Sequence, residues 1–206
     1  MNFVELATAF SGSAKVASHY RRIQRFFKEV NLQPEPVARW VTSLLPYDRF
    51  ILSIDRTNWM LGCFAINFLV LSAVHQGTAF PLFWILLPKK GNSNTKERIQ
   101  LINQFLDILG RHKINYLTGD REFIGQEWFD YLVKNQIQFW LRIKKNMMIS
   151  RSNGRLSPAE NFFRSLPLST ECQLVGRRFV CGHLLWVTGM RPVSYTHLRA
   201  HETSLH

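Results

Sequence analysis

The chain contains few cysteines, few acidic residues and no long hydrophobic run. Its three cysteines, Cys63, Cys172 and Cys181, form no C-x-x-C pair, which argues against a disulfide framework or a zinc ribbon and for a reducing compartment. Cys172, Cys181 and His183 lack a fourth metal ligand, so we do not expect a metal there. No apolar stretch is long enough to span a bilayer, and no signal peptide precedes the first predicted helix. These absences predict a cytoplasmic protein.

Acidic residues are outnumbered: 26 lysines and arginines face 14 aspartates and glutamates, a net charge of +12 over 206 residues. This length allows one good-sized domain, with or without a small appendage. So strong a positive bias favours a polyanionic partner. Nucleic acid is the first choice, an acidic membrane surface the second, and solubility alone the third.

The first part of the chain, 1–46, has helical periodicity. Apolar side chains such as Tyr20 and Ile23 recur at helix spacing, while Arg21, Arg22 and Arg25 occupy other faces. We interpret 1–48 as a helical DNA-binding segment. An ordinary amphipathic helix with a solvated basic face is the alternative.

Two short apolar runs end on aspartates. Phe50 to Ile54 alternates like a strand with one buried face and stops at Asp55, before a turn-like Arg-Thr-Asn. A second run ends at Asp120, where Gly119 permits close backbone approach. If the two strands are neighbours, the two carboxylates converge, and convergent carboxylates are suited to binding hard divalent cations for phosphoryl chemistry.

The periodicity predicts an α/β fold. Three antiparallel strands are followed by helix, strand, helix and strand, which is the ribonuclease-H order, with Asp55 beside Asp120. Pro81 predicts an edge strand or a bulge, Asn94 or Thr95 a helix N-cap, and Gly110 the end of that helix. The predicted elements are strands 50–54, 61–74 and 78–87, a helix over 95–109, a strand at 116–118, a short helix around 128–133 and a strand over 137–143.

The stretches 53–59 (Ser-Ile-Asp-Arg-Thr-Asn-Trp) and 119–123 (Gly-Asp-Arg-Glu-Phe) resemble the first two catalytic blocks of the DDE transposases of IS4-type insertion sequences. The first block departs from the family's frequent Asp-Thr-Thr. The resemblance covers roughly 14–190 and implies a ribonuclease-H-like mixed sheet and two divalent ions, Mg²⁺ or Mn²⁺. It also implies a third carboxylate from a downstream Tyr-x-x-Arg-x-x-x-Glu block.

The same resemblance implies roles for individual residues. Asp55 would bridge both ions and Asp120 would bind one, which makes them the expected catalytic and metal-binding residues. Arg121 would contact a phosphate, and Glu122 would support the site without binding metal. The implied partner is double-stranded DNA at transposon ends, cleaved and transferred during DNA transposition, with a possible homodimer in a synaptic complex. The host would be prokaryotic.

A basic run follows the last predicted core strand. Arg142, Lys144 and Lys145 belong to a stretch without an acidic residue between Tyr131 and Ala159. A solvated face is the alternative, but the position beside the two aspartates favours contacts with a DNA backbone. The resemblance implies a catalytic core, 49–145, followed by the beginning of a β-rich insertion, 146–192, in which 172–180 and 183–189 alternate like two strands.

The last residues, 193–206, show neither helical nor strand periodicity, and we expect a non-native tail outside the fold. Tyr195 and Glu202 have the spacing of the third block, but Leu198 stands at its arginine position. With no third carboxylate in place, we expect the chain as given to be inactive in DNA cleavage. The alternatives are a non-catalytic DNA-binding fragment and, with charge alone in its favour, a membrane-surface protein.

Overall fold

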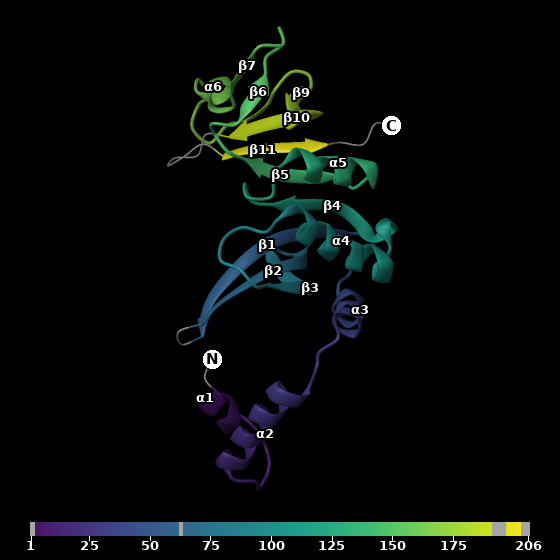
Figure 1. The fold of residues 1–206 in the computed structure, drawn as a ribbon, viewed down its shortest axis with the longest axis vertical. Coiled ribbons are helices and arrows are strands. Elements are labelled where there is room, and N and C mark those ends of the chain that lie inside the picture. Colours follow the sequence, from purple (N-terminus) through teal and green to yellow (C-terminus); the bar gives the residue numbers. More distant parts are fainter. Residues whose placement is uncertain (1–2, 62–63, 191–196, 203–206) are drawn as a thin grey trace. The chain divides into compact units, whose positions relative to one another are not determined.

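The computed structural model describes residues 3–61, 64–190 and 197–202, without side chains at Phe27, Trp59, Leu61, Phe64, Ala65 and 197–202. The chain forms two compact units, with the boundary between Gln33 and Pro34. The first unit is a helical pair, α1 (Phe3–Thr8) and α2 (Val16–Glu29), shown in purple in Figure 1. Ala7, His19 and Ile23 are buried between these helices, and Phe10 stacks on His19 at 5.2 Å.

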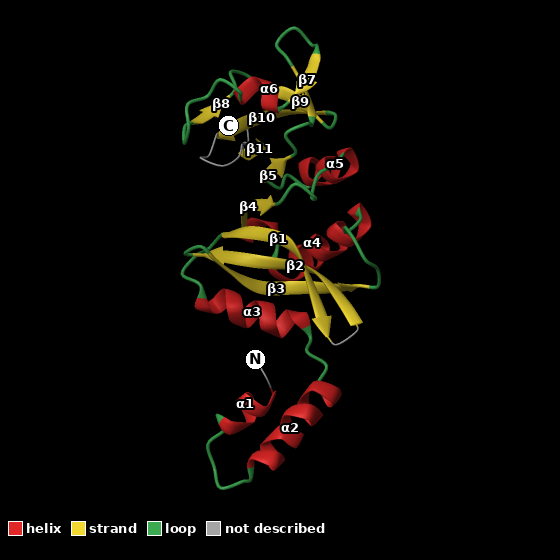
Figure 2. Ribbon diagram, turned by 90° about the vertical axis from the view of Figure 1, so that its left-hand side faces the viewer, coloured by secondary structure: helices red, strands yellow, loops and turns green. Residues whose placement is uncertain are grey.

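The next helix, α3 (Pro34–Leu44), belongs to the second unit. Ala38 is buried in the core of that unit, and Val41 and Leu45 pack against the core. Figure 2 shows α3 alongside β3, which it contacts. From the sequence, we expected this helix to belong with the preceding ones in 1–48. The packing of its apolar stripe makes it part of the sheet domain instead.

Three long strands form the predicted antiparallel meander: β1 (Phe50–Leu61), β2 (Phe64–His75) and β3 (Thr78–Leu87). β3 is the edge strand, and the register shifts opposite Pro81, so both readings of that proline are confirmed. One prediction is wrong. β1 does not end at Asp55 but continues through Arg-Thr-Asn to Leu61, because β2 supplies a hydrogen-bonding partner along its whole length.

Helices and strands then alternate. α4 (Thr95–Leu109) begins at a capping box between Asn94 and Glu97 and ends at Gly110. A short 3₁₀ turn, η1 (Arg111–Lys113), leads into β4 (Ile114–Gly119), α5 (Gln126–Lys134) and β5 (Phe139–Ile143). The strand order is β3-β2-β1-β4-β5, with β4 parallel to both β1 and β5. This is a ribonuclease-H-like mixed sheet, as predicted.

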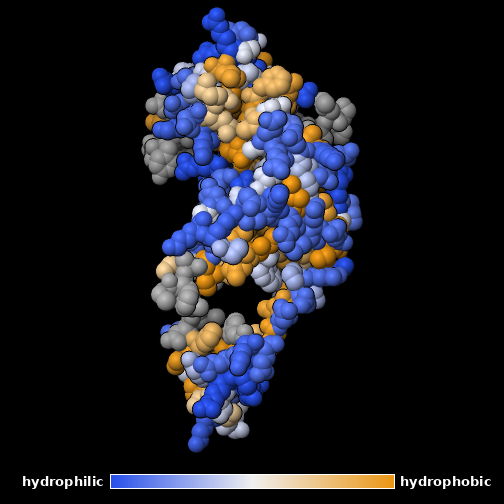
Figure 3. Space-filling model, in the orientation of Figure 1, coloured by the Kyte–Doolittle hydropathy of each residue, from blue (hydrophilic) through white to orange (hydrophobic). Residues whose placement is uncertain are grey.

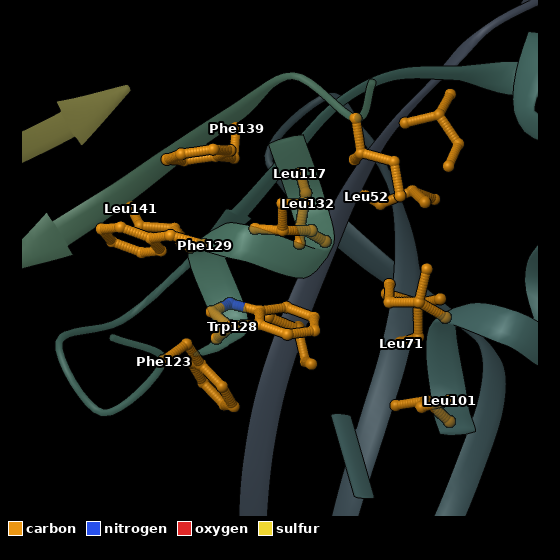
Figure 4. Packing of buried hydrophobic residues seen from close by; sticks show 14 of the residues in the cluster. Leu52, Leu71, Leu101, Leu117, Phe123, Trp128, Phe129, Leu132, Phe139 and Leu141 are labelled. Atoms are coloured by element: carbon orange, nitrogen blue, oxygen red, sulfur yellow. The ribbon is translucent and has the colours of Figure 1, made fainter. Parts of the chain in front are cut away.

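The core of the second unit lies between this sheet and helices α4 and α5. Figure 4 shows Trp128, Phe129 and Leu132 of α5 against Leu117 of β4 and Phe139 of β5. The Phe129 and Phe139 rings stack with centroids 5.1 Å apart. Because these side chains are fully buried, this face of the sheet forms the closely packed core of the domain.

Shorter strands follow the core: β6 (Met148–Ser150) pairs with β7 (Leu156–Pro158), and α6 (Glu160–Phe163) comes next. β8 (Glu171–Gln173) and β9 (Arg178–Val180) each pair with β10 (His183–Met190). Figure 3 shows apolar surface over α6, β6 and β7, where Met148 and Leu156 are exposed. This segment has the β character predicted for 146–192.

The expectation that 193–206 contains no strand is wrong. Residues 197–202 form β11 (His197–Glu202), which pairs antiparallel with both β5 and β10. Tyr195 lies outside the described residues, as does Cys63, while Cys172 and Cys181 are free thiols. Over the described part of the chain, no helix is long and apolar enough to cross a membrane.

Candidate active site beside β1 and β4

The two predicted aspartates follow the last paired residues of neighbouring parallel strands. Ser53 pairs with Thr118 and Ile54 with Gly119, so the next residues are Asp55 and Asp120. The predicted adjacency of these two strands is therefore confirmed, although Asp55 lies within β1 and only Asp120 follows a strand end. The strand end of β4 is tightly packed, because a Cβ added at Gly119 would lie 2.9 Å from Cγ2 of Ile54.

Both aspartates lie on the sheet face that does not carry α4 and α5. Side chains alternate along a strand, and Leu52 and Ile54 are buried toward the helices, so Ser53 and Asp55 face the other way. Asp120 follows the end of β4 and contacts Arg142, whose neighbours Leu141 and Ile143 are the buried residues of β5, so Asp120 is on the same face as Asp55. Asp55 also borders a pocket of about 450 Å³ on this face. The other residues lining it are Ser53, Thr57, Phe68, Val70, Ser72, Ala79, Pro81 and Trp84.

Each aspartate has a nearby hydrogen-bond or ion-pair partner. The backbone N–H of Arg56 donates to Oδ1 of Asp55 at 2.8 Å. Nη1 of Arg142, on β5, lies 3.5 Å from Oδ1 of Asp120. Both carboxylates remain exposed, so their other oxygens are accessible to a ligand.

Glu122 is part of a separate contact on the other side of β1. Its carboxylate pairs with Arg56, whose Nε lies 3.2 Å from both Oε1 and Oε2. Arg56 follows Asp55 in a strand, so its side chain leaves the sheet on the opposite face. Glu122 could be predicted from the sequence, but its partner Arg56 could not, because the two residues are 66 positions apart.

The predicted DNA-binding residues fall into two groups. Arg142 lies at the aspartates, and the exposed Lys144 and Lys145 follow β5 directly, while Arg121 is exposed after Asp120. Arg21, Arg22 and Arg25 are exposed on α2, in the first unit. Arg142 thus contacts one of the aspartates, whereas Arg121, Lys144 and Lys145 lie in the loops that follow β4 and β5.

Hard divalent cations suit the donor set of this site. Asp55 and Asp120 offer exposed carboxylate oxygens from a rigid pair of strands, which are ligands that Mg²⁺ and Mn²⁺ accept. Among the described residues, no group of three or more His, Cys, Asp or Glu side chains is placed to hold a metal ion. His183 instead contacts Asp130, with Nε2 and Oδ1 2.8 Å apart.

The strand order defines a ribonuclease-H-like domain, with Asp55 and Asp120 directly after the last paired residues of β1 and β4. Residues 67–193 match the family model described as "Transposase DDE domain". The chain belongs to this family. The matched range contains Asp120 and begins after Asp55. No curated protein matches the chain.

Several solved structures are similar to this chain. One is a piggyBac transposase synaptic complex with hairpin DNA, at 14% identity and a TM-score of 0.45, covering 79% of this chain and 35% of that one. A simian T-cell lymphotropic virus intasome bound to the PP2A regulatory subunit B56 gamma has 15% identity, a TM-score of 0.36 and coverages of 74% and 54%. An endonuclease V from Bacillus subtilis has 8% identity, a TM-score of 0.39 and coverages of 94% and 79%. The chain thus spans less than two thirds of the first two.

Proposed function

We propose that this chain acts in DNA transposition, as part of an IS4-type DDE transposase that cleaves and transfers DNA strands with divalent metal ions. The observation that supports the proposal is the register of β1 and β4, which pairs Ile54 with Gly119, the residues directly before Asp55 and Asp120. Family membership supports the same assignment. The protein would act on DNA in the cytoplasm of a prokaryote.

The residues have distinct proposed roles. Asp55 and Asp120 would hold the divalent ions, Mg²⁺ or Mn²⁺. When bound, two such ions activate a water or a 3′ hydroxyl and stabilise the leaving oxygen. Arg121, Arg142, Lys144 and Lys145 would bind the phosphates of the DNA backbone.

The proposed DNA partner is the duplex at the transposon ends. Arg21, Arg22 and Arg25 would bind DNA from the helical unit. Phosphate contacts of this kind position DNA without reading its sequence. A homodimer would bring two transposon ends together in a synaptic complex.

Metal binding tests the proposal directly. We expect Mn²⁺, titrated into the full chain and followed by electron paramagnetic resonance, to bind the wild-type protein. Asp55→Ala or Asp120→Ala should weaken binding by at least about 10-fold, since each removes a direct ligand. The matched control is Asp107→Ala, which removes an exposed carboxylate from α4 and should change nothing. If Asp55→Ala binds Mn²⁺ as tightly as the wild-type protein, the proposed site is wrong.

A non-catalytic DNA-binding role is the second candidate. It is favoured by the lack of a third metal-ligating side chain near Asp55 and Asp120 among the described residues. The sequence-based expectation that this chain does not cleave DNA with Mg²⁺ or Mn²⁺ stays a prediction. Losing one element that stabilises charge in the transition state typically costs a factor of about 10²–10³ in rate. Cleavage that disappears in Asp55→Ala would contradict it, and Glu202 would then be the first residue to test.

A further inference from the structure

On the helix-covered side of β1, opposite the aspartates, one arginine connects three segments of the chain. Nε of Arg56 pairs with the Glu122 carboxylate, as described above. Nη1 of Arg56 also donates to Oδ1 of Asn58 at 2.9 Å, within the same strand. Nη2 lies 3.5 Å from Oδ1 of Asn92, in the loop before α4. Arg56 therefore links β1, the segment after β4 and the loop after β3.

A second arginine holds the backbone of the same turn. Nη2 of Arg98, on α4, donates to the carbonyl oxygen of Glu122 at 3.1 Å and to that of Ser93 at 2.7 Å. Its guanidinium also lies over the Phe123 ring, 5.3 Å from the centroid. Arg98 is buried, and burial lowers its pKa, partly offset by Glu122 and Glu97. The turn that carries Asp120 is thus fixed from the helix side.

The loop before α4 is itself fastened to β2. Nδ2 of Asn67 donates to the carbonyl oxygens of Lys89 at 2.9 Å and Gly91 at 3.0 Å. Asn67 is buried, so these amide hydrogen bonds are shielded from water. The surroundings of Arg56 and Glu122 are therefore rigid on three sides.

The Arg56 and Glu122 side chains are largely shielded from water, so their contact restrains the segments that carry them. The two side chains are 16% and 18% exposed, and Nε is shared between both carboxylate oxygens. Removing one partner leaves a largely desolvated charge unpaired, which is strongly unfavourable. Each member of the pair is joined through the backbone to one aspartate, because Arg56 follows Asp55 directly and Glu122 follows Asp120 by two residues.

We infer that Arg56 and Glu122 are positioning residues that hold Asp55 and Asp120 at the separation needed to share a divalent ion. The inference rests on the proposed function, because it concerns the same metal site. Neither side chain is a metal ligand, since both lie on the opposite side of β1. Removing a residue that orients a metal-binding side chain typically weakens metal affinity by about 10–100-fold.

The test measures Mn²⁺ affinity by electron paramagnetic resonance in the full chain, well below the melting temperature of each variant. We expect Arg56→Gln and Glu122→Gln each to weaken Mn²⁺ binding by about 10-fold or more. The double variant should lose no more than either single variant, because both break one contact. Arg56→Lys keeps the charge and should bind better than Arg56→Gln. The matched control is Arg39→Gln with Glu35→Gln, which breaks an exposed ion pair on α3 and should leave affinity unchanged.

A second measurement separates positioning from a purely structural role. Amide hydrogen exchange of 118–124 in metal-free protein should be faster in Arg56→Gln and Glu122→Gln than in the wild-type protein. Wild-type Mn²⁺ affinity in both variants, even with lower melting temperatures, would overturn the inference and leave the proposed function standing. Mn²⁺ binding that is also insensitive to Asp55→Ala would overturn the proposed function. If both Gln variants unfold, Glu122→Asp takes their place, because its shorter side chain draws the carboxylate away from Arg56. Wild-type Mn²⁺ affinity and unchanged exchange in Glu122→Asp would refute the inference.

Discussion

The two faces of the central sheet differ in what their side chains do. On one face, Leu52, Ile54, Leu117 and Leu141 are buried under α4 and α5. On the other face, the next residues along the same strands are half-buried or exposed and include Asp55 and Arg142. The buried face fixes the backbone, and the open face carries polar groups whose positions depend on it. Substitutions should therefore separate into those that change stability and those that change binding.

The largest expected effect comes from neighbouring residues on opposite faces. Leu117→Ala leaves a cavity in the core and should lower the free energy of unfolding by about 2–5 kcal/mol. Thr118→Ala, one residue later on the open face, should cost about 1 kcal/mol or less. Urea denaturation of the two variants provides the measurement. Equal losses would mean that the two faces contribute alike, contrary to the comparison.

A smaller loss should follow from adding one methyl group at Gly119. In Gly119→Ala the new Cβ would lie 2.9 Å from Cγ2 of Ile54, 3.0 Å from Cδ2 of Phe123 and 3.1 Å from Cδ2 of Leu141. Overpacking of this kind typically costs about 1–3 kcal/mol. Denaturation would measure the loss, and Mn²⁺ titration would show whether the displaced strand end also weakens the site. If the variant is as stable as the wild-type protein, the neighbouring side chains can move to make room for the methyl group, contrary to this prediction.

The smallest effect concerns the loop that leaves the open face. Lys144→Ala should reduce the steepness with which duplex DNA affinity falls with salt, by about 0.9 in a plot of log affinity against log salt. Lys134→Ala is the matched control, because Lys134 lies before β5 and Lys144 after it, at the opposite end of the strand. Fluorescence anisotropy across a salt series would measure both slopes. If the salt slope changes in the Lys134 variant alone, the DNA does not contact the loop that follows β5.

Much of the fold follows from local patterns. The alternation of Phe50, Leu52 and Ile54, the Asn94–Glu97 capping box and Pro81 all describe neighbours in sequence, and each prediction from them is confirmed. The errors involve pairing over long distances. β1 passes through a turn-like Arg-Thr-Asn because β2 pairs with it, and β11 forms where β5 and β10 supply its hydrogen bonds.

The candidate site divides in the same way. Asp55 and Asp120 could be predicted because each ends or interrupts a recognisable strand pattern. The Arg56–Glu122 contact could not, because no local pattern connects residues 66 positions apart. The burial of Arg98 could not be predicted either, because a charged residue in an amphipathic helix is ordinarily solvated. Only tertiary packing buries it.

The parallel pairing of β1 with β4 also has a consequence for folding during synthesis on the ribosome. The two aspartates are separated by 120 − 55 = 65 residues. At roughly 5–20 residues per second, Asp120 is added about 3–13 s after Asp55. During that interval the nascent chain can form the β1–β2–β3 meander, whose contacts are local, but it carries one isolated acid. The acidic pair is therefore absent from every early intermediate of synthesis, and the chain acquires it only once β4 has been made and has docked.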